Sequence, residues 1–372
     1  MNALPSLGKN LRRWRRSLLW PLTFGIITAA LCPLIPLAGA AAPAPVLPTV
    51  PNDHSSADNP GWIMRTTQQY SPASWNVFLE YDRLPAELES SRKGGWVVAM
   101  KKPAGTFPQL TRNDRKTELI DKMAQHLHFL TLALQRLHVF RHTRENNILM
   151  DWERAEAFFD LSGAGTFYVS FPMKSLYPSS ELTAAVPDSL RTALFDAHIK
   201  ECKAAQRFGV IGLLEEFHAH YAEARFYADM LPAYRLAEGS EADGLLAWVQ
   251  NSQGSIGAFY EFDFFILEYL LYMKRQYAAD YEALKSCRPF VDAYGAIRSL
   301  YGALADQFMN TIRAETRRLN SPGKTEAGYT DNILWIRTGD SNRGARVFTE
   351  RQKLASAADS IRHAPIIADF SK

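Results

Sequence analysis

The sequence predicts a mainly α-helical fold with a small β component (α+β): a long antiparallel helical hairpin packed with further helices and a small sheet. Three features predict it. Several long stretches carry apolar residues at helical spacing, residues 238–257 between two of them are rich in Gly, Ser and Asp, and short β-branched or aromatic runs are bounded by turn residues. Residues 71–320 are predicted to form one domain, which is long enough to bury a substantial core.

Residues 1–40 are predicted to be a signal peptide. Basic residues from Lys9 to Arg16 precede an apolar run over 18–37, and the small residues Ala38-Gly39-Ala40 follow as a cleavage site. The sequence leaves open Sec or twin-arginine export, and also an uncleaved anchor, which would be the chain's one contact with a membrane. The predicted location is therefore the periplasm or the medium. Residues 41–70, rich in Ala and Pro and then polar, are predicted to be a linker.

The charge of the mature chain argues against a nucleic-acid partner. Residues 1–40 hold five basic and no acidic residues, so their removal takes the formal net charge from +3 to −2. A nearly neutral chain lacks the basic surface that phosphate backbones require.

Residues 71–173 are predicted to mix strands with one long helix. Strands are expected within 74–82 and 96–100, with a turn at 92–95, and again at 165–173. Leucine and other apolar residues spaced by three and four predict a helix over 117–142, and 151–159 is expected to be a short helix. His138 and His142 stand one turn apart on the long helix, a spacing that can chelate a metal, but an ordinary surface helix is the favoured explanation because the sequence H-V-F-R-H lacks the glutamate of a zinc peptidase helix.

The hairpin is predicted from residue 187 onward. One helix is expected over 187–230, with a bend or a close backbone contact at Gly209 and Gly212, and a second over 258–285. A third helix follows over 290–319. Residues 321–372 are predicted to be a polar C-terminal extension with strand-like runs at 332–337 and 345–349.

A hairpin closed across residues 231–257 places residues opposite each other when their numbers sum to about 490. Cys202 and Cys287 then lie level with each other. In an oxidising compartment these two cysteines are predicted to form a disulfide, with free thiols as the alternative.

The predicted site lies between the two hairpin helices. Glu216, His220 and Glu223 recur at i, i+4 and i+7 and share one stripe of the first helix. Glu268 is the only charge between Phe264 and Met273, and the register sets it level with Tyr221 and Glu223. Carboxylates with one imidazole suit zinc, manganese or iron, so these four residues are candidate ligands of a divalent metal.

Roles within this candidate site follow from its chemistry. Glu223 is either a fourth ligand or the base that activates water, Glu216 is the other catalytic candidate, and Tyr221 or Tyr269 would orient a carboxylate. The alternative is purely structural: Glu216 pairs with Lys274 or Arg275, Glu223 with Arg225, and Glu268 accepts tyrosine hydroxyls. A di-iron bundle is not expected, because Glu215 and His218 form the chain's one Glu-x-x-His pair.

Residues 212–221 resemble a known pattern. Gly212-Leu213-Leu214, Glu215-Glu216-Phe217, Ala219 and Tyr221 are similar to the G-L-L-(acid)-E-F-x-A-Y-Y helix of a group of secreted bacterial proteins of unassigned function. The chain departs from that pattern at His218 and His220. The resemblance implies a shared fold and export, with Glu216 and Tyr221 as the transferable positions, and implies no activity.

Two functions stay open at this point, and the sequence does not decide whether the chain is an enzyme. One is an exported binding or scaffolding protein for a small ligand, a peptide or a glycan. The other is a metal-dependent, hydrolase-like enzyme that uses the carboxylates and the histidine between the helices. The sequence holds no G-x-S-x-G, Walker, G-x-G-x-x-G, C-x-x-C or H-E-x-x-H motif, which favours the binding protein.

Overall fold

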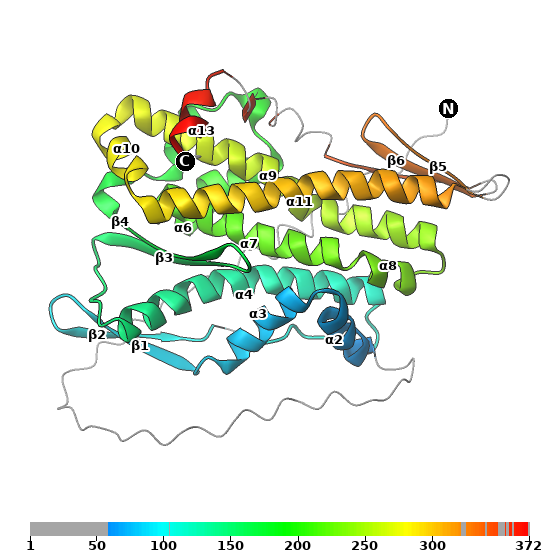
Figure 1. Ribbon diagram of the computed structural model, residues 1–372, viewed down its shortest axis with the longest axis horizontal. Helices are drawn as coiled ribbons and strands as arrows, with labels where there is room; N and C mark the ends of the chain where they lie inside the picture. The colour runs from blue at the N-terminus through cyan, green and yellow to red at the C-terminus, as the bar shows by residue number, and fades with distance from the viewer. Residues whose placement is uncertain are drawn as a thin grey trace.

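The structure is a computed structural model of the whole chain, and it confirms a mainly helical fold with small antiparallel sheets (Figure 1). It describes residues 59–103, 105–320, 325–338, 341–348, 354, 357–358 and 361–370. The predicted signal peptide and residues 41–58 of the predicted linker lie outside these ranges. Within the described residues, no helix combines the length and the apolar character needed to cross a bilayer.

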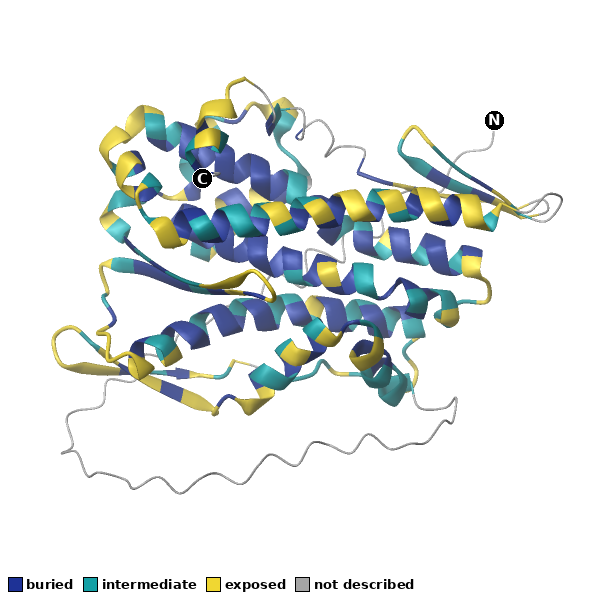
Figure 2. Cartoon of the chain, in the orientation of Figure 1, coloured by how far each residue is buried: buried dark blue, intermediate teal, exposed yellow. Residues whose placement is uncertain are grey.

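The core is built around helix α7 (Val210–Asp229), which packs against three longer helices. These are α4 (Lys116–Glu145) on one side and α9 (Glu241–Gln276) and α11 (Arg288–Leu319) on the other. Figure 2 shows α7 dark along most of its length, because nearly all of its side chains are buried. A helix buried on every side must satisfy any charge it carries from its neighbours, and α7 carries several.

The predicted helices at 117–142 and 290–319 are confirmed as α4 and α11. Their leucine and aromatic stripes, among them Leu127, Leu134 and Tyr301, are buried as the spacing predicted. Pro289 stands in the first turn of α11, where its missing N–H costs no hydrogen bond.

The antiparallel hairpin is confirmed, but its predicted register is wrong. Trp248 Nε1 donates to the carbonyl of Tyr227 at 2.7 Å, and the rings of Phe262 and Phe217 lie 6.0 Å apart. Compared with the predicted register, α9 has moved along α7 by about three to four turns of 3.6 residues. The cause is the connection, which is short: α8 (Leu231–Ala237) continues the chain and α9 begins at Glu241.

Glycine and serine predict that residues 241–257 belong to the connection, with one short helix around 245–250, but all of these residues lie in the first turns of α9. Ser240 caps the helix by accepting a hydrogen bond from the Asp243 amide at 3.1 Å. A Cβ atom on Gly244 would lie 2.6 Å from the carbonyl oxygen of Tyr234, so this glycine allows α8 and α9 to approach closely. Small residues mark a tight helix contact here, not a loop.

The predicted helix over 187–230 is interrupted, as its glycines indicated. The chain passes through short turns before α7, and Gly209 takes a φ of +55° between α6 and α7. A Cβ on Gly212 would lie 2.6 Å from the Ala205 amide nitrogen, so the close backbone contact predicted there is confirmed. The elements of this segment are η3 (Ser179–Ala184), η4 (Asp188–Leu190), α5 (Ala193–Phe195), the π-helical η5 (Asp196–Glu201) and α6 (Lys203–Phe208).

Gly209→Ala is expected to lower the free energy of unfolding by at least about 2 kcal/mol, because alanine disfavours positive φ and the added methyl has no room. Its Cβ would meet the Tyr269 hydroxyl and lie 2.9 Å from the Tyr177 carbonyl oxygen. Urea denaturation measures the change. Gly239→Ala is the matched control, since nothing lies within 4 Å of its Cβ position and its φ is not positive. Equal stability for the two variants would contradict the close contact.

Three small antiparallel sheets complete the described part of the fold. Two predictions in this region are wrong: residues 75–82 lie in the helix α3 (Pro72–Arg83), and residues 154–159 lie in a strand. In both places neighbouring elements decide, since α3 packs on α4 and residues 154–161 pair with the confirmed strand at 165–172. The sheets are β1 (Glu87–Arg92) with β2 (Trp96–Lys101), β3 (Arg154–Leu161) with β4 (Gly165–Pro172), and β5 (Thr325–Thr330), β6 (Ile333–Thr338) and β7 (Ser341–Arg346).

Both ends of the described chain belong to the folded body. Residues 59–70, predicted as linker, form helix α2 (Asn59–Tyr70), which packs against α3 and α4. The predicted polar extension contains β6 at the expected place, and its sheet packs against α11. The helix α13 (Ala364–Phe370) packs against α9 and α11. The remaining short elements are η2 (Met173–Ser175) and α10 (Ala278–Lys285).

Candidate metal centre

Histidines and glutamates from three elements meet on one face of α7. We call His128, His198, Glu216, His220 and Glu223 the His–Glu cluster. α7 presents its three members on one stripe, α4 contributes His128, and η5 contributes His198. The helical spacing of the stripe therefore decides which side chains of α7 face α4 and η5.

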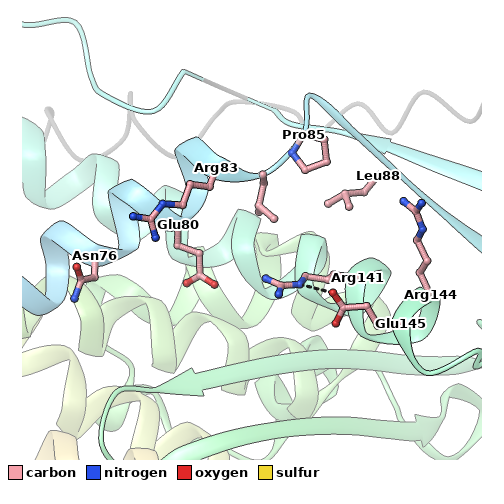
Figure 3. A pocket seen from close by; sticks show the side chains of 9 residues that line it. Asn76, Glu80, Arg83, Pro85, Leu88, Arg141, Arg144 and Glu145 are labelled. Atoms are coloured by element: carbon pink, nitrogen blue, oxygen red, sulfur yellow. Dashed lines mark hydrogen bonds and ion pairs between the residues drawn. The ribbon is translucent and has the colours of Figure 1, made fainter. Parts of the chain in front are cut away.

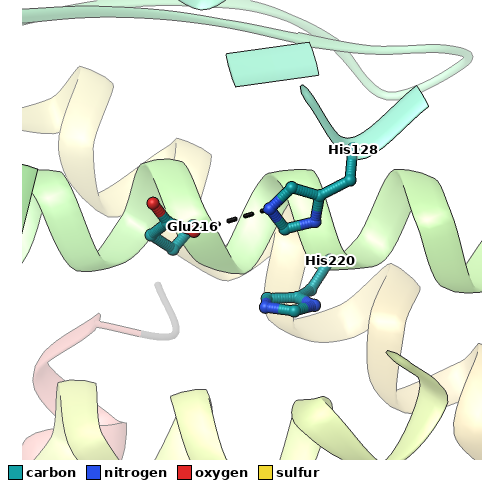
Figure 4. A group of neighbouring side chains, drawn as sticks. All are labelled: His128, Glu216 and His220. Carbon is teal, nitrogen blue, oxygen red and sulfur yellow. Dashed lines mark ion pairs between the residues drawn. The ribbon is translucent and has the colours of Figure 1, made fainter. Parts of the chain in front are cut away.

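His128 lies between the two carboxylates of the cluster. Its Nδ1 is 3.1 Å from Glu223 Oε2, and its Nε2 is 3.6 Å from Glu216 Oε2 (Figure 4). A protonated imidazole can donate from both nitrogens, so His128 is well placed to balance two acids in the metal-free protein.

His198 and His220 have a different environment. His220 Nδ1 lies 3.6 Å from Glu223 Oε2, and His198 Nδ1 lies 3.8 Å from Glu216 Oε2. These distances are too long for hydrogen bonds. All four ring nitrogens of the two residues are buried without a hydrogen-bond partner among the residues that the structure describes. The side chains are 1% and 3% exposed, so water does not replace the missing partners at the surface.

Apolar packing holds these two rings in place. The Phe262 ring, on α9, lies 4.8 Å from the His198 ring and 5.1 Å from the His220 ring, measured between centroids. The His128 and His220 rings are 4.5 Å apart. Phe262 thus closes the cluster on the α9 side and leaves the nitrogens facing the carboxylates.

The protonation states follow from burial and charge. Burial lowers the pKa of His198 to about 3 and also lowers the pKa of His220, so both are neutral at physiological pH. Burial acts the same way on His128, but the hydrogen bond to Glu223 and the nearby negative charge of Glu216 outweigh burial and raise its pKa to about 9. Burial would raise the pKa of each glutamate. The protonated imidazole of His128, which lies against both carboxylates, instead lowers the pKa of each glutamate to about 2.

The neutral imidazoles of His198 and His220 and the two ionised carboxylates are in the protonation state that a transition metal requires, and His128 would release its proton on binding one. One ligand atom from each of His128, Glu216 and His220 can be chosen so that all three lie within 4.8 Å of one another. Tetrahedral zinc, with bonds of about 2.0–2.2 Å, holds its ligand atoms about 3.3 Å apart, so shifts of about 1 Å would complete the site. Glu223 or His198 stands ready as a fourth ligand.

A thiol lies beside the cluster. Cys202 Sγ donates to Glu216 Oε1 at 3.6 Å, and burial raises the thiol pKa well above its usual value. The predicted Cys202–Cys287 disulfide is wrong, because both cysteines are free. The disulfide was predicted from the register of the hairpin, which is wrong. Cys202 lies at the start of α6 and Cys287 at the start of α11, so the two residues do not face each other across the hairpin.

Glu268 does not belong to the cluster, contrary to prediction, because α9 has a different register. Its carboxylate pairs with Arg362 and with His363, whose Nε2 lies 2.8 Å away. These two residues come just before α13, so Glu268 ties the C-terminal segment to α9. The alternative pairings predicted for the acids are also replaced: Lys274 pairs with Asp369, and Arg225 with Asp229.

Neither tyrosine expected to orient a carboxylate does so. The Tyr269 hydroxyl donates to the Tyr177 carbonyl at 2.9 Å and accepts from its amide at 3.0 Å, which fixes the turn before η3. Tyr221 points to another side of α7, where its ring lies 5.6 Å from that of Tyr301.

Two ligand candidates were missed by the sequence: His128 and His198. His128 is one of four histidines on the helix at 117–142, and only His138 and His142 among them have the i, i+4 spacing that suggests chelation. Those two have separate partners: His138 Nε2 lies 3.2 Å from Glu80, and the His142 ring stacks 4.4 Å from Tyr168. The sequence feature that could have indicated His128 is its position next to the buried Leu127, on the side of α4 that packs against α7.

Comparison with known proteins found no matching family model, no similar curated protein and no similar solved structure. The resemblance of residues 212–221 to a group of secreted proteins therefore stays a prediction. Any function must be inferred from the residues of the chain itself.

Proposed function

We propose that this chain is an exported metal-binding protein that holds a transition-metal ion, zinc by preference, between α4, α7 and η5. His128, Glu216 and His220 bind the ion, and Glu223 or His198 completes its coordination. The observation that carries the proposal is the set of buried, unpartnered nitrogens of His198 and His220 beside two carboxylates. A buried polar group without a partner costs about 1–3 kcal/mol, a cost that a bound ion would remove.

The donor set favours zinc over harder ions. Imidazole nitrogen suits zinc, copper and iron, whereas magnesium and calcium prefer oxygen ligands alone. The Cys202 thiol beside Glu216 adds a soft donor that lies close enough to join the coordination after a side-chain rotation.

Binding is favoured over catalysis because the site is closed. The side chains of His128 and Glu216 are 17% and 12% exposed, and His220 is buried. A catalytic zinc keeps one position open to substrate, whereas a structural zinc is enclosed by protein ligands. Glu223, the candidate base of a hydrolase, is buried against His128 and His220, and it lines neither of the two pockets at α3 and α4.

Export is the second part of the proposal, and the predicted signal peptide of residues 1–40 supports it. A closed metal site suits an exported protein that is stabilised by its ion or that carries it. A protein that folds around an ion in this way gains stability from the metal directly.

Elemental analysis of protein purified without chelators tests the proposal. About one zinc per chain is expected in the parent protein and in Glu268→Gln, because Glu268 lies outside the cluster and pairs with His363. A combined Glu216→Gln and His220→Phe variant is expected to contain none. Metal-free parent protein that stays metal-free after incubation with zinc would refute the proposal. Loss of zinc in Glu268→Gln alone would place the ion elsewhere.

A further inference from the structure

A groove separate from the His–Glu cluster runs along α3 and α4. Its inner pocket, of 170 Å³, lies between α3, α4, β3 and α7, and its outer pocket, of 830 Å³, lies between the C-terminal ends of α3 and α4 and the start of β1. Asn76 and Glu80 line both pockets, which makes them two compartments of one groove. None of the cluster residues lines either compartment.

The inner compartment combines carboxylates with aromatic surface. Glu80 and Asp160 both line it, together with His138 and Phe158, whose rings lie 5.2 Å apart. Burial, and then the negative charge of Glu80, raise the pKa of Asp160. The negative charge of Glu80 therefore reaches Asp160, although His138, whose Nε2 lies 3.2 Å from Glu80 Oε1, offsets part of it. A cation between the two carboxylates would relieve the remaining repulsion. Arg225, the arginine of this compartment, is paired with Asp229.

The outer compartment has the opposite character. Figure 3 shows Arg83 and Arg144 on its two sides, with Glu80 and Arg141 between them. Arg141 donates from Nε to Glu145 at 2.8 Å, whereas Arg83 and Arg144 have no side-chain hydrogen bond or ion pair to any residue that the structure describes. Leu84, Pro85 and Leu88 supply an apolar wall. Two free guanidinium groups beside apolar surface suit an anionic group on a partly apolar ligand.

We propose that this groove binds a short peptide as a zwitterion, with its free amino group between Glu80 and Asp160 and its carboxylate at Arg83 and Arg144. Carboxylates next to aromatic rings recognise ammonium groups, and arginines bind carboxylates through paired N–H donors. At 170 Å³ the inner compartment exceeds the about 150 Å³ of an engineered cavity that admits benzene, so it has room for one small residue. The outer compartment would hold the remainder of the chain and its carboxyl end.

The proposal goes beyond metal binding and is tested without reference to it. The probes are alanine peptides of one to four residues, titrated calorimetrically into the full chain. At the length that binds best, N-acetylation and C-terminal amidation are each expected to weaken binding at least about tenfold, the cost of losing one charge-assisted contact.

Variants assign each end of the probe to its compartment. In Glu80→Gln/Asp160→Asn, acetylation is expected to have no further effect while amidation still weakens binding. In Arg83→Ala/Arg144→Ala, the pattern is reversed. Both arginines are exposed, so their replacement does not threaten folding. Arg112→Ala, an exposed arginine outside the groove, is the matched control and should bind like the parent.

Three results would overturn the proposal. The first is that no alanine peptide binds, and the second is that the free, acetylated and amidated forms bind equally well. The third is that the groove variants behave like Arg112→Ala. Zinc content should be the same in all these variants, so a failed peptide experiment leaves the metal site intact, and a failed metal experiment leaves the groove intact.

Discussion

His220→Phe is expected to abolish the stabilisation that zinc gives this protein, while leaving the metal-free fold as stable as the parent or more so. Replacing a partner of a metal ligand typically costs 10–100-fold in affinity, so losing a ligand should cost at least about 100-fold. At a zinc concentration of about 100 times the parent dissociation constant, the parent gains about 2.7 kcal/mol and the variant less than about 0.5 kcal/mol. Urea denaturation with and without zinc measures both values.

The stability measured without zinc shows whether His220 is a metal ligand or an ordinary core residue. Phenylalanine keeps an aromatic ring against Phe262 and removes two buried nitrogens that have no hydrogen-bond partner. Removing such atoms is expected to leave the metal-free stability unchanged or to raise it by about 1 kcal/mol. His142→Gln is the control, because His142 lies at the end of α4 and stacks on Tyr168 away from the cluster. A zinc response in His220→Phe equal to that of His142→Gln would exclude His220 as a ligand.

Zinc binding should also displace a proton. The pKa of His128 is raised to about 9 by Glu216 and Glu223, so the metal-free protein holds a proton there at neutral pH. A metal ion and a proton compete for the same imidazole nitrogen. Calorimetric titration of zinc at pH 7, in buffers of different ionisation enthalpy, should therefore report the release of about one proton per ion.

Asp263→Ala is expected to lower the free energy of unfolding by about 3 kcal/mol, because it breaks a buried ion pair by removing one partner. Asp263 lies on α9 beside Phe262 and accepts from Arg298 Nε at 2.7 Å and from Arg298 Nη2 at 3.1 Å. It also accepts from the Tyr294 hydroxyl at 2.9 Å. Its removal deprives a partly buried guanidinium and a buried phenol of their shared acceptor. Urea denaturation provides the measurement.

Two further variants decide why that stability is lost. Asp292→Ala removes an acid from the exposed surface of the same helix pair, where Asp292 and Arg288 form an i,i+4 ion pair, and should cost less than about 0.5 kcal/mol. Adding Arg298→Met to Asp263→Ala should recover part of the loss, since the cation that lost its carboxylate is then gone. No recovery would mean that the cavity, and not the loss of the carboxylate beside Arg298, caused the destabilisation.

The ion pair matters to the metal site through α9. Asp263 and Arg298 join α9 to α11, and the adjacent Phe262 packs on the rings of His198 and His220. Loss of the contact between Asp263 and Arg298 is expected to loosen the packing of Phe262 on the rings of His198 and His220. Asp263→Ala should therefore weaken zinc binding as well as stability, whereas Asp292→Ala should change neither.

The sequence by itself determined the features that depend only on the spacing of residues within one helix. The leucine spacing of α4 and the aromatic spacing of α11 predicted both helices, and Gly209 and Gly212 predicted the interruption and the close contact before α7. It also placed Glu216, His220 and Glu223 on one stripe, and the structure keeps them together. Helix geometry fixes such relations at 3.6 residues per turn, whatever surrounds the helix.

Only the tertiary structure decided which elements face each other. The glycines and serines of residues 244–257 are compatible with a loop and equally with a tight helix contact. The close approach of Gly244 to Tyr234 shows that they form a helix contact. That choice set the register of α9, and with it the removal of Glu268 from the site and the separation of Cys202 from Cys287. His128 and His198 joined the cluster for the same reason. The burial of a side chain and the identity of its partner depend on surfaces that come together from distant parts of the chain. The spacing of residues along one helix does not predict them.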